Sequence, residues 1–456
     1  MEKDFLHKHL QLESPSVHCI GIGGIGVSAI AEYMLEAGFQ VSGSDESYNS
    51  NCRRLEELGA LIAPAGHRES NVPENCGAVV YTAAASNNNC ELAKLLRQGA
   101  TGWKRGEFVG EIALAYQRAV MITGTHGKSS TTAMLGWILT YAGKDPGLLL
   151  GAKYSDQSPR VSVGSGDILV AEADESDDSL GMLRGELALI TNVDGDHAWT
   201  PQAEKKQQEI LQRFARGFKN IIFMDSPRCT QLFGGLAAAR ALTAVEYAEY
   251  EKFVPEFMLG HERSNAVLAL AGAEYLDVDL SIAAEALKKY PGIDRRLQEI
   301  YRSADGSITV VNDYAHHPTE LASAIDVVRA RYGADSSLLV VFQPHRYQRL
   351  HRYWDEFVAL LSRPELTVKI LPVFSAWEFQ FIDALDSRQL TDAVKKAGGN
   401  AELLSGDHQQ NALALAAEVL EKKAQAPLTV LIAGAGDVEK MVLPLADALK
   451  SGSTGA

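Results

Sequence analysis

Residues 124–132, GTHGKSSTT, combine glycines, a lysine and hydroxyl side chains, and these residue types together suit the binding of phosphate. The usual phosphate-binding loop has a glycine, four free residues and then Gly-Lys-Ser/Thr. Gly127, Lys128 and Ser129 fit the end of this pattern, but Ile122 stands where the first glycine belongs. A loop that only caps a helix explains the hydroxyls, but not a lysine at the positive end of the helix dipole. We therefore predict a phosphate loop of a different build, with Lys128 on the phosphates and Ser129 on Mg²⁺.

Carboxylates and a histidine follow the next two apolar segments of the chain. VAEADESDDS and TNVDGDH supply Glu172, Asp174, Glu175, Asp177, Asp178, Asp194, Asp196 and His197. Such ligands at the carboxyl ends of neighbouring strands suit a hard cation such as Mg²⁺. Glu172, two residues beyond the apolar run, is the better metal candidate, whereas we interpret Asp177 and Asp178 as part of a solvated acidic loop.

A glycine turn near the start of the chain fits the dinucleotide-binding pattern G-x-G-x-x-G. Gly21, Gly23, Gly24 and Gly26 follow the apolar segment VHCI, and Asp45 ends the next apolar segment, where an acidic residue would meet a ribose. A plain strand-to-helix turn is the alternative. A nicotinamide cofactor and a nucleotide-sugar both carry a pyrophosphate and a ribose, so the motif alone does not separate them.

Two polar segments, NDYAHHP and FQPHRYQR, each end an apolar run in the last third of the chain. His345, Arg346 and Arg349 can grip carboxylate or phosphate oxygens, and nothing nearby in the sequence neutralises the two arginines. The adjacent histidines of NDYAHHP are explained about as well by an ordered turn. Arg295 and Arg296 of GIDRR are either surface residues or a phosphate fork.

The elements that must position these residues alternate between short apolar strands and helical patterns in three successive blocks. Each block opens with a strand, and this alternation predicts α/β domains with parallel sheets covered on both faces. We expect three domains in series, at residues 1–105, 106–294 and 295–456.

The composition narrows the class of protein. The 456 residues include 43 basic and 58 acidic side chains, a formal charge of −15, which disfavours nucleic acid and anionic membranes as partners. No apolar run reaches the ~18 residues of a membrane span, and the first residues lack the apolar stretch of a signal peptide. The five cysteines form no C-x-x-C pair, so neither a zinc site nor a disulfide framework is indicated, and we expect a cytoplasmic protein.

Five segments in this order resemble the Mur ligase family of peptidoglycan synthesis: GIGGIGVSAIAEYMLEAGFQVSGSD, GTHGKSSTTAML, VAEADESD, NDYAHHPTE and FQPHRYQR. The resemblance extends from about residue 17 to residue 440, and the family's G-T-[NH]-G-K-[ST]-[ST]-T loop accounts for the short phosphate loop. It implies a Rossmann-like UDP-binding domain, a P-loop-type central ATPase domain with a mostly parallel sheet, and a Rossmann-like C-terminal domain. The implied reaction joins L-alanine to the lactyl carboxylate of UDP-N-acetylmuramate through an acyl phosphate, in cell-wall synthesis, with ATP and two Mg²⁺ ions.

The resemblance also implies a role for each matching residue. The UDP-sugar would meet Gly21, Gly23, Gly24, Gly26, Ser44 and Asp45. ATP would meet Gly124, Thr125, His126, Gly127, Lys128, Ser129, Ser130, Asn192, His261, Asn265, Arg296 and Asp313. The metal ligands would be Ser129, Glu172 and His197, and the amino-acid site would contain Tyr314, His345, Arg346 and Arg349. The residues expected to carry catalysis are Lys128, His197, His345, Arg346 and Arg349.

The chain departs from the family pattern at three places. Glu262 stands where an asparagine is common, no methionine follows His197, and Trp377 replaces the glycine that usually precedes Glu378. Because the third domain chooses the amino acid, the last change leaves the choice among L-alanine, glycine and L-serine open. Two other functions also stay open, namely a ligase that adds a recycled tripeptide and a nucleotide-sugar-binding regulator without catalysis. An NAD-dependent oxidoreductase is the weakest candidate, and the chain could form a monomer or a dimer.

Overall fold

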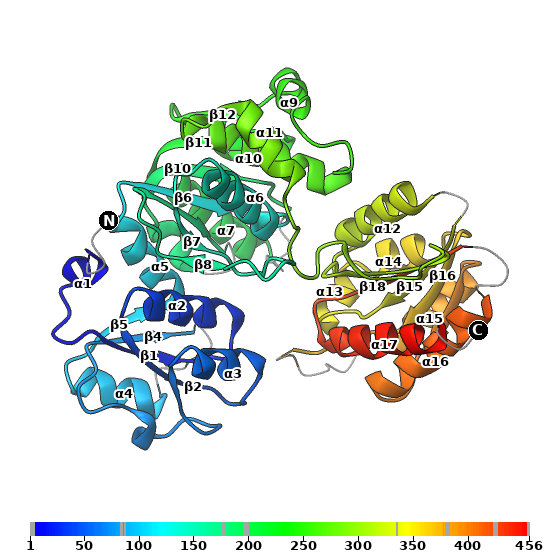
Figure 1. Ribbon diagram of the computed structural model, residues 1–456, viewed down its shortest axis with the longest axis horizontal. Coiled ribbons are helices and arrows are strands. Elements are labelled where there is room, and N and C mark those ends of the chain that lie inside the picture. Colours follow the sequence, from blue (N-terminus) through cyan, green and yellow to red (C-terminus); the bar gives the residue numbers. More distant parts are fainter. Residues whose placement is uncertain are drawn as a thin grey trace. The chain divides into compact units, whose positions relative to one another are not determined.

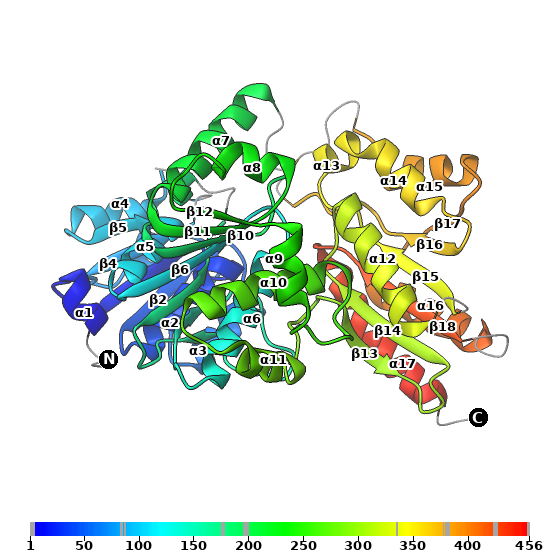
Figure 2. The same cartoon turned by 90° about the horizontal axis from the view of Figure 1, so that it is seen from above.

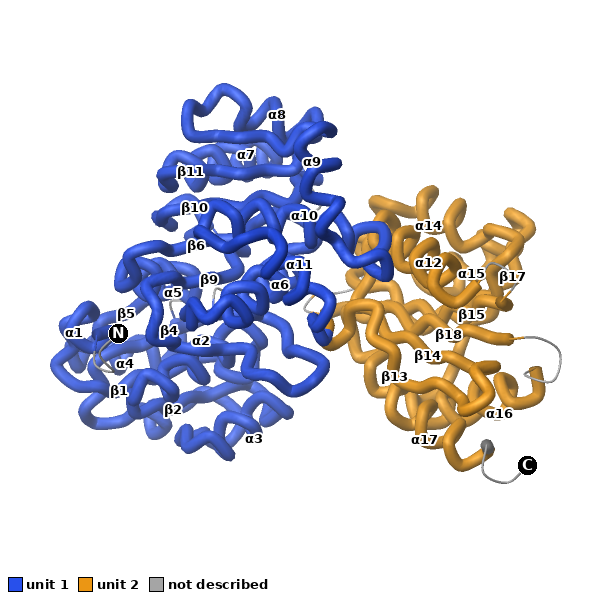
Figure 3. Tube along the Cα trace, turned by 45° about the horizontal axis from the view of Figure 1, so that its top comes forward, with its two compact units in different colours: residues 1–291 blue, residues 292–456 orange. Residues whose placement is uncertain are grey.

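The computed structural model contains three sheets, each covered by helices on both faces (Figures 1 and 2). The described residues are 5–82, 85, 88–174, 178–194, 200–333, 336–376, 378, 384–422 and 427–453. They form two compact units, residues 1–291 with two of the sheets and residues 292–456 with the third (Figure 3). The parallel-rich sheets confirm the predicted α/β class, while the domain boundaries near residues 105 and 294 stay a prediction.

The first sheet is entirely parallel and has the strand order β3-β2-β1-β4-β5. Its strands are β1 (Ser16–Ile20), β2 (Gln40–Ser44), β3 (Leu61–Ile62), β4 (Ala78–Tyr81) and β5 (Thr101–Lys104). Its helices are α1 (Phe5–Leu10), α2 (Ile25–Glu36), α3 (Ser50–Glu57), α4 (Cys90–Arg97) and α5 (Arg105–Leu114). Helices α2 and α5 pack on one face and α4 on the other, so β1 is buried along its whole length. The glycine turn follows β1, at the carboxyl edge of the sheet.

The central sheet has the order β12-β11-β10-β6-β9-β7-β8, with only the β7–β8 pair antiparallel among the described strands. Its strands are β6 (Arg118–Thr123), β7 (Gly147–Leu149), β8 (Val161–Ser162), β9 (Ile168–Glu172), β10 (Gly185–Ile190), β11 (Phe218–Met224) and β12 (Ala239–Leu242). Its helices are α6 (Lys128–Tyr141), α7 (Pro201–Ala215), α8 (Pro227–Phe233), α9 (Ala244–Glu251), α10 (Gly260–Tyr275) and α11 (Leu280–Lys288). Glu172 lies opposite Ile122, and Ile190 lies opposite Thr123. The segments that follow β6, β9 and β10 therefore leave the sheet at one edge.

A buried ion pair joins the first sheet's helix α2 to the segment before β8. Arg160, 2% exposed, contacts Glu32 through Nε at 3.0 Å and donates from Nη2 to Ser28 Oγ at 3.3 Å. Arg54 Nη2 lies 2.7 Å from the other oxygen of Glu32. Burial opposes ionisation of Glu32, but the hydrogen bond from Arg54 and the charge of Arg160 outweigh it and lower the pKa of the carboxyl. The two sheets of the first unit are thus linked by a paired, desolvated charge.

We expect Glu32→Ala to destabilise the protein by about 3–5 kcal/mol, because it leaves the Arg160 guanidinium buried without its carboxylate. Urea unfolding followed by circular dichroism measures the loss. The double variant Glu32→Leu with Arg160→Met is the control, and it should recover most of the stability because no charge stays buried. A loss below about 1 kcal/mol, the size typical of an exposed pair, would contradict this account of the contact.

The third sheet has the order β13-β14-β18-β15-β16-β17, with β13 as its antiparallel edge strand. Its strands are β13 (Gln298–Arg302), β14 (Ile308–Asp313), β15 (Ser337–Phe342), β16 (Leu366–Ile370), β17 (Asn400–Leu403) and β18 (Leu428–Ala433). Its helices are α12 (Pro318–Tyr332), α13 (Tyr347–Arg352), α14 (Trp354–Leu361), α15 (Ser387–Lys396), α16 (His408–Lys422) and α17 (Val442–Ser453). Helices α12 and α14 cover one face, and α16 and α17 the other (Figure 1). Asp313 lies opposite Ala433, which lies opposite Phe342, so β14, β18 and β15 end side by side. None of the described helices is long and apolar enough to span a bilayer.

Candidate active site

The phosphate-loop candidate connects β6 to α6 through two glycines in the left-handed region of φ. Gly124 has φ 135° and Gly127, the N-cap of α6, has φ 83°. A Cβ on Gly124 would lie 2.1 Å from Thr191 Oγ1, so no larger residue fits there. Lys128 begins α6, with Ser129 and Ser130 in the same first turn. The loop therefore has the sharp glycine-dependent path that brings backbone N–H groups towards a bound anion.

Asn192, which follows β10, holds this loop from the neighbouring strand. Its Oδ1 accepts a hydrogen bond from the His126 N–H and its Nδ2 donates to the His126 carbonyl oxygen, both at 2.9 Å. Thr191 Oγ1 donates to the same carbonyl at 2.6 Å, and the Asp194 N–H donates to Thr125 Oγ1 at 2.9 Å. Asn192 thus fixes the backbone of the loop at His126, while its predicted place near a nucleotide stays a prediction.

Lys128 and Ser129, in the first turn of α6, contact the loop backbone and Glu172 at the end of β9, respectively. Lys128 Nζ donates to the carbonyl oxygens of Gly124, at 2.6 Å, and Thr125, at 3.2 Å. Ser129 Oγ donates to Glu172 Oε2 at 2.7 Å. A hydroxyl and a carboxylate side by side are hard oxygen ligands that fit Mg²⁺.

The third predicted metal ligand, His197, lies outside the described residues, as do Glu175, Asp177 and Asp196. Within the described part of the chain, no group of three or more His, Cys, Asp and Glu side chains forms a metal site. Asp178 pairs with Lys206 at 2.6 Å, and both side chains are exposed, which agrees with the solvated interpretation of Asp178. Of the three predicted metal ligands, the described residues therefore include only Ser129 and Glu172, and the metal site stays a prediction.

Arg105, at the start of α5, lies between the glycine turn of the first sheet and the carboxylates of the central sheet. A Cβ on Gly26 would stand 2.7 Å from Arg105 Cδ, and Arg105 Nη2 lies 3.3 Å from Asp174 Oδ2. A small pocket here is lined by Arg105, Asp174, Glu172 and Ser179, among others. The position of this arginine could not be predicted from the sequence, since 69 residues separate it from Asp174.

Helix α10 approaches the phosphate loop with Asn265. A Cβ on Gly127 would lie 2.3 Å from Asn265 Oδ1, so this side chain presses on the loop's glycine. His261 stands four residues earlier on α10 and therefore on the same helix face, one turn away. The structure places Asn265 beside the loop, while His261 and Glu262 belong to the first turn of α10.

The glycine turn after β1 is held by side chains from the segment after β2. Asp45 Oδ2 accepts a hydrogen bond from the Gly23 N–H at 2.9 Å, and the Gly21 N–H donates to the Ser44 carbonyl oxygen at 2.9 Å. Asn49 and Asn51 donate to the Gly23 carbonyl oxygen at 3.1 Å and 2.9 Å. Gly21 through Gly26, Ser44 and Asp45 thus lie together, and the two asparagines are additions that the sequence reading missed.

In the second unit, Arg349 holds His345. Arg349 Nη1 lies 3.1 Å from His345 Nδ1 and donates to the His345 carbonyl oxygen at 3.3 Å. Because a guanidinium only donates, Nδ1 must accept and the ring proton belongs on Nε2. Burial, followed by the positive charges of His316, Arg349 and neighbouring arginines, lowers the pKa of His345 to about 3. His345 is therefore a neutral hydrogen-bond donor at physiological pH.

Arg346 has a carboxylate partner that is distant in the sequence. Its Nε donates to Glu378 Oε1 at 2.6 Å, and Glu378 Oε2 accepts from the Gln348 N–H at 3.2 Å. The partner comes from 32 residues away, so the local sequence could not reveal it. Arg346 has φ 71°, a strained conformation for a side chain of this size and one that clusters at functional sites. Trp377, before Glu378, lies outside the described residues.

His316 connects Tyr314 with His345 and was not predicted as a site residue. Its ring centroid lies 5.4 Å from that of Tyr314 and 5.5 Å from that of His345. The guanidinium carbons of Arg295 and Arg296 lie 4.7 Å and 5.2 Å from the Tyr314 ring centroid. The structure thus places His316 between Tyr314 and His345, and places the two arginines of GIDRR over the Tyr314 ring.

Two further residues of this segment shape its backbone. His317 caps α12 by accepting a hydrogen bond from the Thr319 N–H at 3.2 Å. This is the ordered turn that the sequence offered as one explanation of the adjacent histidines. Asp313 accepts from the backbone N–H groups of Leu297, at 2.8 Å, and Ala315, at 2.7 Å. Burial raises the pKa of Asp313 to about 6, against the opposing charge of Arg296.

Sequence profiles of known families match two regions of the chain. The profile described as Mur ligase family, catalytic domain, matches residues 16–117, and the profile described as Mur ligase, glutamate ligase domain, matches residues 295–436. A UDP-N-acetylmuramate–L-alanine ligase of Desulforapulum autotrophicum is 34% identical over 92% of this chain and 96% of that protein. Its counterpart in Xanthomonas oryzae pv. oryzae is 34% identical over 93% of both chains.

Solved structures share the fold over nearly the whole chain. The UDP-N-acetylmuramate-alanine ligase MurC of Thermotoga maritima superimposes with a TM-score of 0.75 at 22% identity, covering 96% of this chain and 99% of that one. A murein peptide ligase of Psychrobacter arcticus gives a TM-score of 0.64 at 20% identity, covering 95% and 98%. At these identities the likeness concerns the three-domain α/β architecture.

Proposed function

The chain belongs to the Mur ligase family, and from this premise we propose that it joins L-alanine to the lactyl carboxylate of UDP-N-acetylmuramate. As a member of the family it is an ATP-dependent ligase that forms a C–N bond. The observation that carries the choice of substrates is the 34% identity, over more than nine-tenths of the chain, with alanine-adding ligases. The proposal includes two Mg²⁺ ions, a cytoplasmic location, and either a monomer or a dimer.

The proposed reaction has two steps. A lactyl carboxylate oxygen attacks the γ-phosphorus of ATP, and the bond between this phosphorus and the oxygen bridging to the β-phosphate breaks. ADP departs and the product is an acyl phosphate. The amine of L-alanine then attacks the acyl carbon, phosphate leaves, and the nitrogen loses a proton. Lys128 would offset the repulsion between carboxylate and triphosphate, so the rate enhancement would come from positioning and electrostatic stabilisation.

The contacts described above support a division of labour among the three sheets. In the first, the turn held by Asp45 would bind the UDP diphosphate. In the second, Lys128, Ser129 and the clamped loop would bind the ATP phosphates, while Ser129 and Glu172, with His197, would hold Mg²⁺, which polarises phosphoryl oxygens. In the third, the amino-acid site would contain Tyr314, His345, Arg346 and Arg349, with Arg296 and Asp313 on the nucleotide.

Phosphate release from ATP and Mg²⁺ in the presence of UDP-N-acetylmuramate tests the proposal. L-alanine, glycine, L-serine and the recycled tripeptide L-alanyl-γ-D-glutamyl-meso-diaminopimelate are supplied one at a time. We expect release to be fastest with L-alanine. Release with the tripeptide alone would replace the substrate assignment and leave the acyl-phosphate mechanism standing. Silence with every acceptor, together with retained UDP-sugar binding, would favour a regulator without catalysis.

Glu172→Gln should lower the apparent affinity of the enzyme for Mg²⁺ by about 10- to 100-fold, because it removes the charged oxygen that Ser129 contacts. The half-saturating Mg²⁺ concentration for phosphate release measures the effect. Asp178→Asn serves as the control, since Asp178 is exposed and paired with Lys206. An unchanged Mg²⁺ dependence in Glu172→Gln would remove Glu172 from the metal site.

A further inference from the structure

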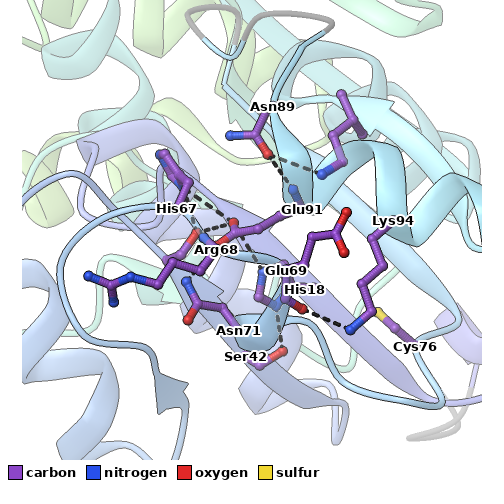
Figure 4. A network of polar contacts seen from close by, with 12 residues as sticks. His18, Ser42, His67, Arg68, Glu69, Asn71, Cys76, Asn89, Glu91 and Lys94 are labelled. Atoms are coloured by element: carbon purple, nitrogen blue, oxygen red, sulfur yellow. Dashed lines mark hydrogen bonds and ion pairs between the residues drawn. The ribbon is translucent and has the colours of Figure 1, made fainter.

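Glu91 is a fully buried carboxylate that belongs to no site described so far. It stands in the first turn of α4, on the face of the first sheet opposite α2, and its exposed fraction is 0% (Figure 4). One oxygen accepts hydrogen bonds from Asn71 Nδ2 at 2.6 Å and from the Arg68 N–H at 2.9 Å. The other accepts from Ser44 Oγ and lies 3.2 Å from His67 Nδ1.

The carboxylate is ionised at neutral pH and acts only as an acceptor. Burial opposes its ionisation, but the nearby His18 ring and hydrogen bonds from Ser44, the Arg68 N–H and Asn71 outweigh burial and lower the pKa of Glu91 to about 2. His18 itself is fully buried, with Nε2 3.6 Å from Glu91 and Nδ1 2.8 Å from Ser42 Oγ. The charge is therefore compensated within the network.

The network ends at the glycine turn that is proposed to bind the UDP diphosphate. Ser44 is the last residue of β2, and it precedes Asp45, which bonds the Gly23 N–H. The Gly66 N–H donates to the Asp45 carbonyl oxygen at 2.8 Å, which places His67 directly beside this turn. Glu91 thus fixes two groups that border the turn, the hydroxyl of Ser44 and the imidazole of His67.

The same contacts decide which nitrogen of His67 carries the proton. Nδ1 lies 2.9 Å from Ser44 Oγ and 3.2 Å from a Glu91 oxygen. Because the Ser44 hydroxyl already donates its proton to Glu91, both oxygens can only accept from Nδ1, and a singly protonated ring has its lone pair on Nε2. Nε2 lies 3.7 Å from Glu46 Oε1, and the Glu46 side chain is 83% exposed. The acceptor nitrogen of His67 therefore points towards the solvent-accessible edge next to Asp45.

We propose that Glu91 is a positioning residue for the nucleoside end of the UDP-sugar, acting through His67. It orients the imidazole so that Nε2 accepts a hydrogen bond from a donor of the uridine, either a ribose hydroxyl or the imide N–H of the base. This inference rests on the proposed function, in which the turn of Gly21 to Gly26 binds UDP.

Isothermal titration of the full-length protein with UDP tests the inference in four variants. His67→Ala and Glu91→Gln should each weaken UDP binding by about tenfold, the effect of one lost hydrogen bond. The double variant should bind no more weakly than His67→Ala alone, because Glu91 acts through a group that is already absent. Glu69→Gln is the matched control: it lies in the same loop, is exposed and pairs with Arg97, and it should bind UDP as the wild type does.

Kinetics separate positioning from a general loss of structure. KM for UDP-N-acetylmuramate should rise in His67→Ala and Glu91→Gln, while kcat and KM for ATP stay unchanged. The His67 side chain is 18% exposed, so His67→Ala should fold. This variant keeps the test decisive if Glu91→Gln unfolds. Repeating the titration with 2′-deoxy-UDP and CDP identifies the donor: the analogue that lacks the donor should bind wild type and His67→Ala equally.

Several outcomes would overturn the inference. Wild-type binding in both single variants would do so, as would additive losses in the double variant or a loss in His67→Ala that Glu91→Gln does not share. Failure of the wild-type protein itself to bind UDP would instead count against the proposed function. The two failures are therefore distinguishable in one set of titrations.

Discussion

Replacing Lys128 with alanine is expected to lower kcat by at least about 10²- to 10³-fold, the range found when one preorganised donor to a developing charge is lost. The ammonium is the cation that begins α6, and it already bonds the carbonyl oxygens of Gly124 and Thr125. With ATP bound, the same group would face phosphate oxygens, and no side chain of comparable charge belongs to the loop. Coupled-enzyme detection of ADP with saturating substrates measures the loss.

The same variant should bind UDP with unchanged affinity, because Lys128 belongs to the loop after β6 of the central sheet, whereas the glycine turn follows β1 of the first sheet. Lys219→Ala is the control for the loss of one positive charge. Lys219 belongs to β11, which lies in the central sheet together with β6. Its side chain is exposed and pairs with Glu186 at 2.8 Å, so its removal should leave kcat unchanged. Near-normal ADP production by Lys128→Ala would refute the assignment of residues 124–130 as the phosphate loop.

Arg349→Met should reduce kcat/KM by about 10²-fold, the effect of misplacing a reacting partner by about an ångström. Methionine fills much of the buried volume but supplies no donor for His345 Nδ1, so the ring is no longer fixed with its proton on Nε2. Removing the adjacent guanidinium also removes one of the charges that lower the pKa of His345, and that pKa should rise from about 3 towards its ordinary value near 6.5.

The pH profile distinguishes this role from a merely structural one. In the wild type, His345 stays neutral above about pH 4 and contributes no limb to kcat/KM between pH 5 and 9. In Arg349→Met, protonation of the ring as pH falls should add an acidic limb. Arg352→Met, on the exposed side of the same helix α13, should keep both the rate and the profile of the wild type. A variant that is slow at every pH, with an unchanged profile, would mean that Arg349 supports only the fold.

The parts of the site that could be predicted from the sequence lie directly after apolar strands. Lys128, Glu172 and Asn192 follow β6, β9 and β10, and parallel strands bring their carboxyl ends to one edge, so adjacency follows from element order alone. The ordered turn at His317 was equally accessible, because a histidine before a proline that opens a helix is a local pattern.

The parts that the sequence could not reveal depend on which residues face each other across elements. Glu378 neutralises Arg346 from 32 residues away, and Glu91 meets Ser44 from 47 residues away. Periodicity tells which face of a helix is buried, but not which polar side chain of another element lies opposite. A buried carboxylate such as Glu91 reads in the sequence as an ordinary charge in the first turn of a helix.

The link between α2 and the segment before β8 limits how this chain can be recombined with its relatives. Glu32 and Arg160 are 128 residues apart, and the Val163 N–H donates to Glu36 Oε1 at 3.0 Å beside them. A crossover at residue 105 would combine α2 from one parent with residue 160 from the other. Where the parents differ at residue 32 or 160, this leaves a buried charge without its partner. Chimeras that exchange residues 1–105 together with 144–166 should therefore express as folded protein, whereas those that exchange residues 1–105 alone should not.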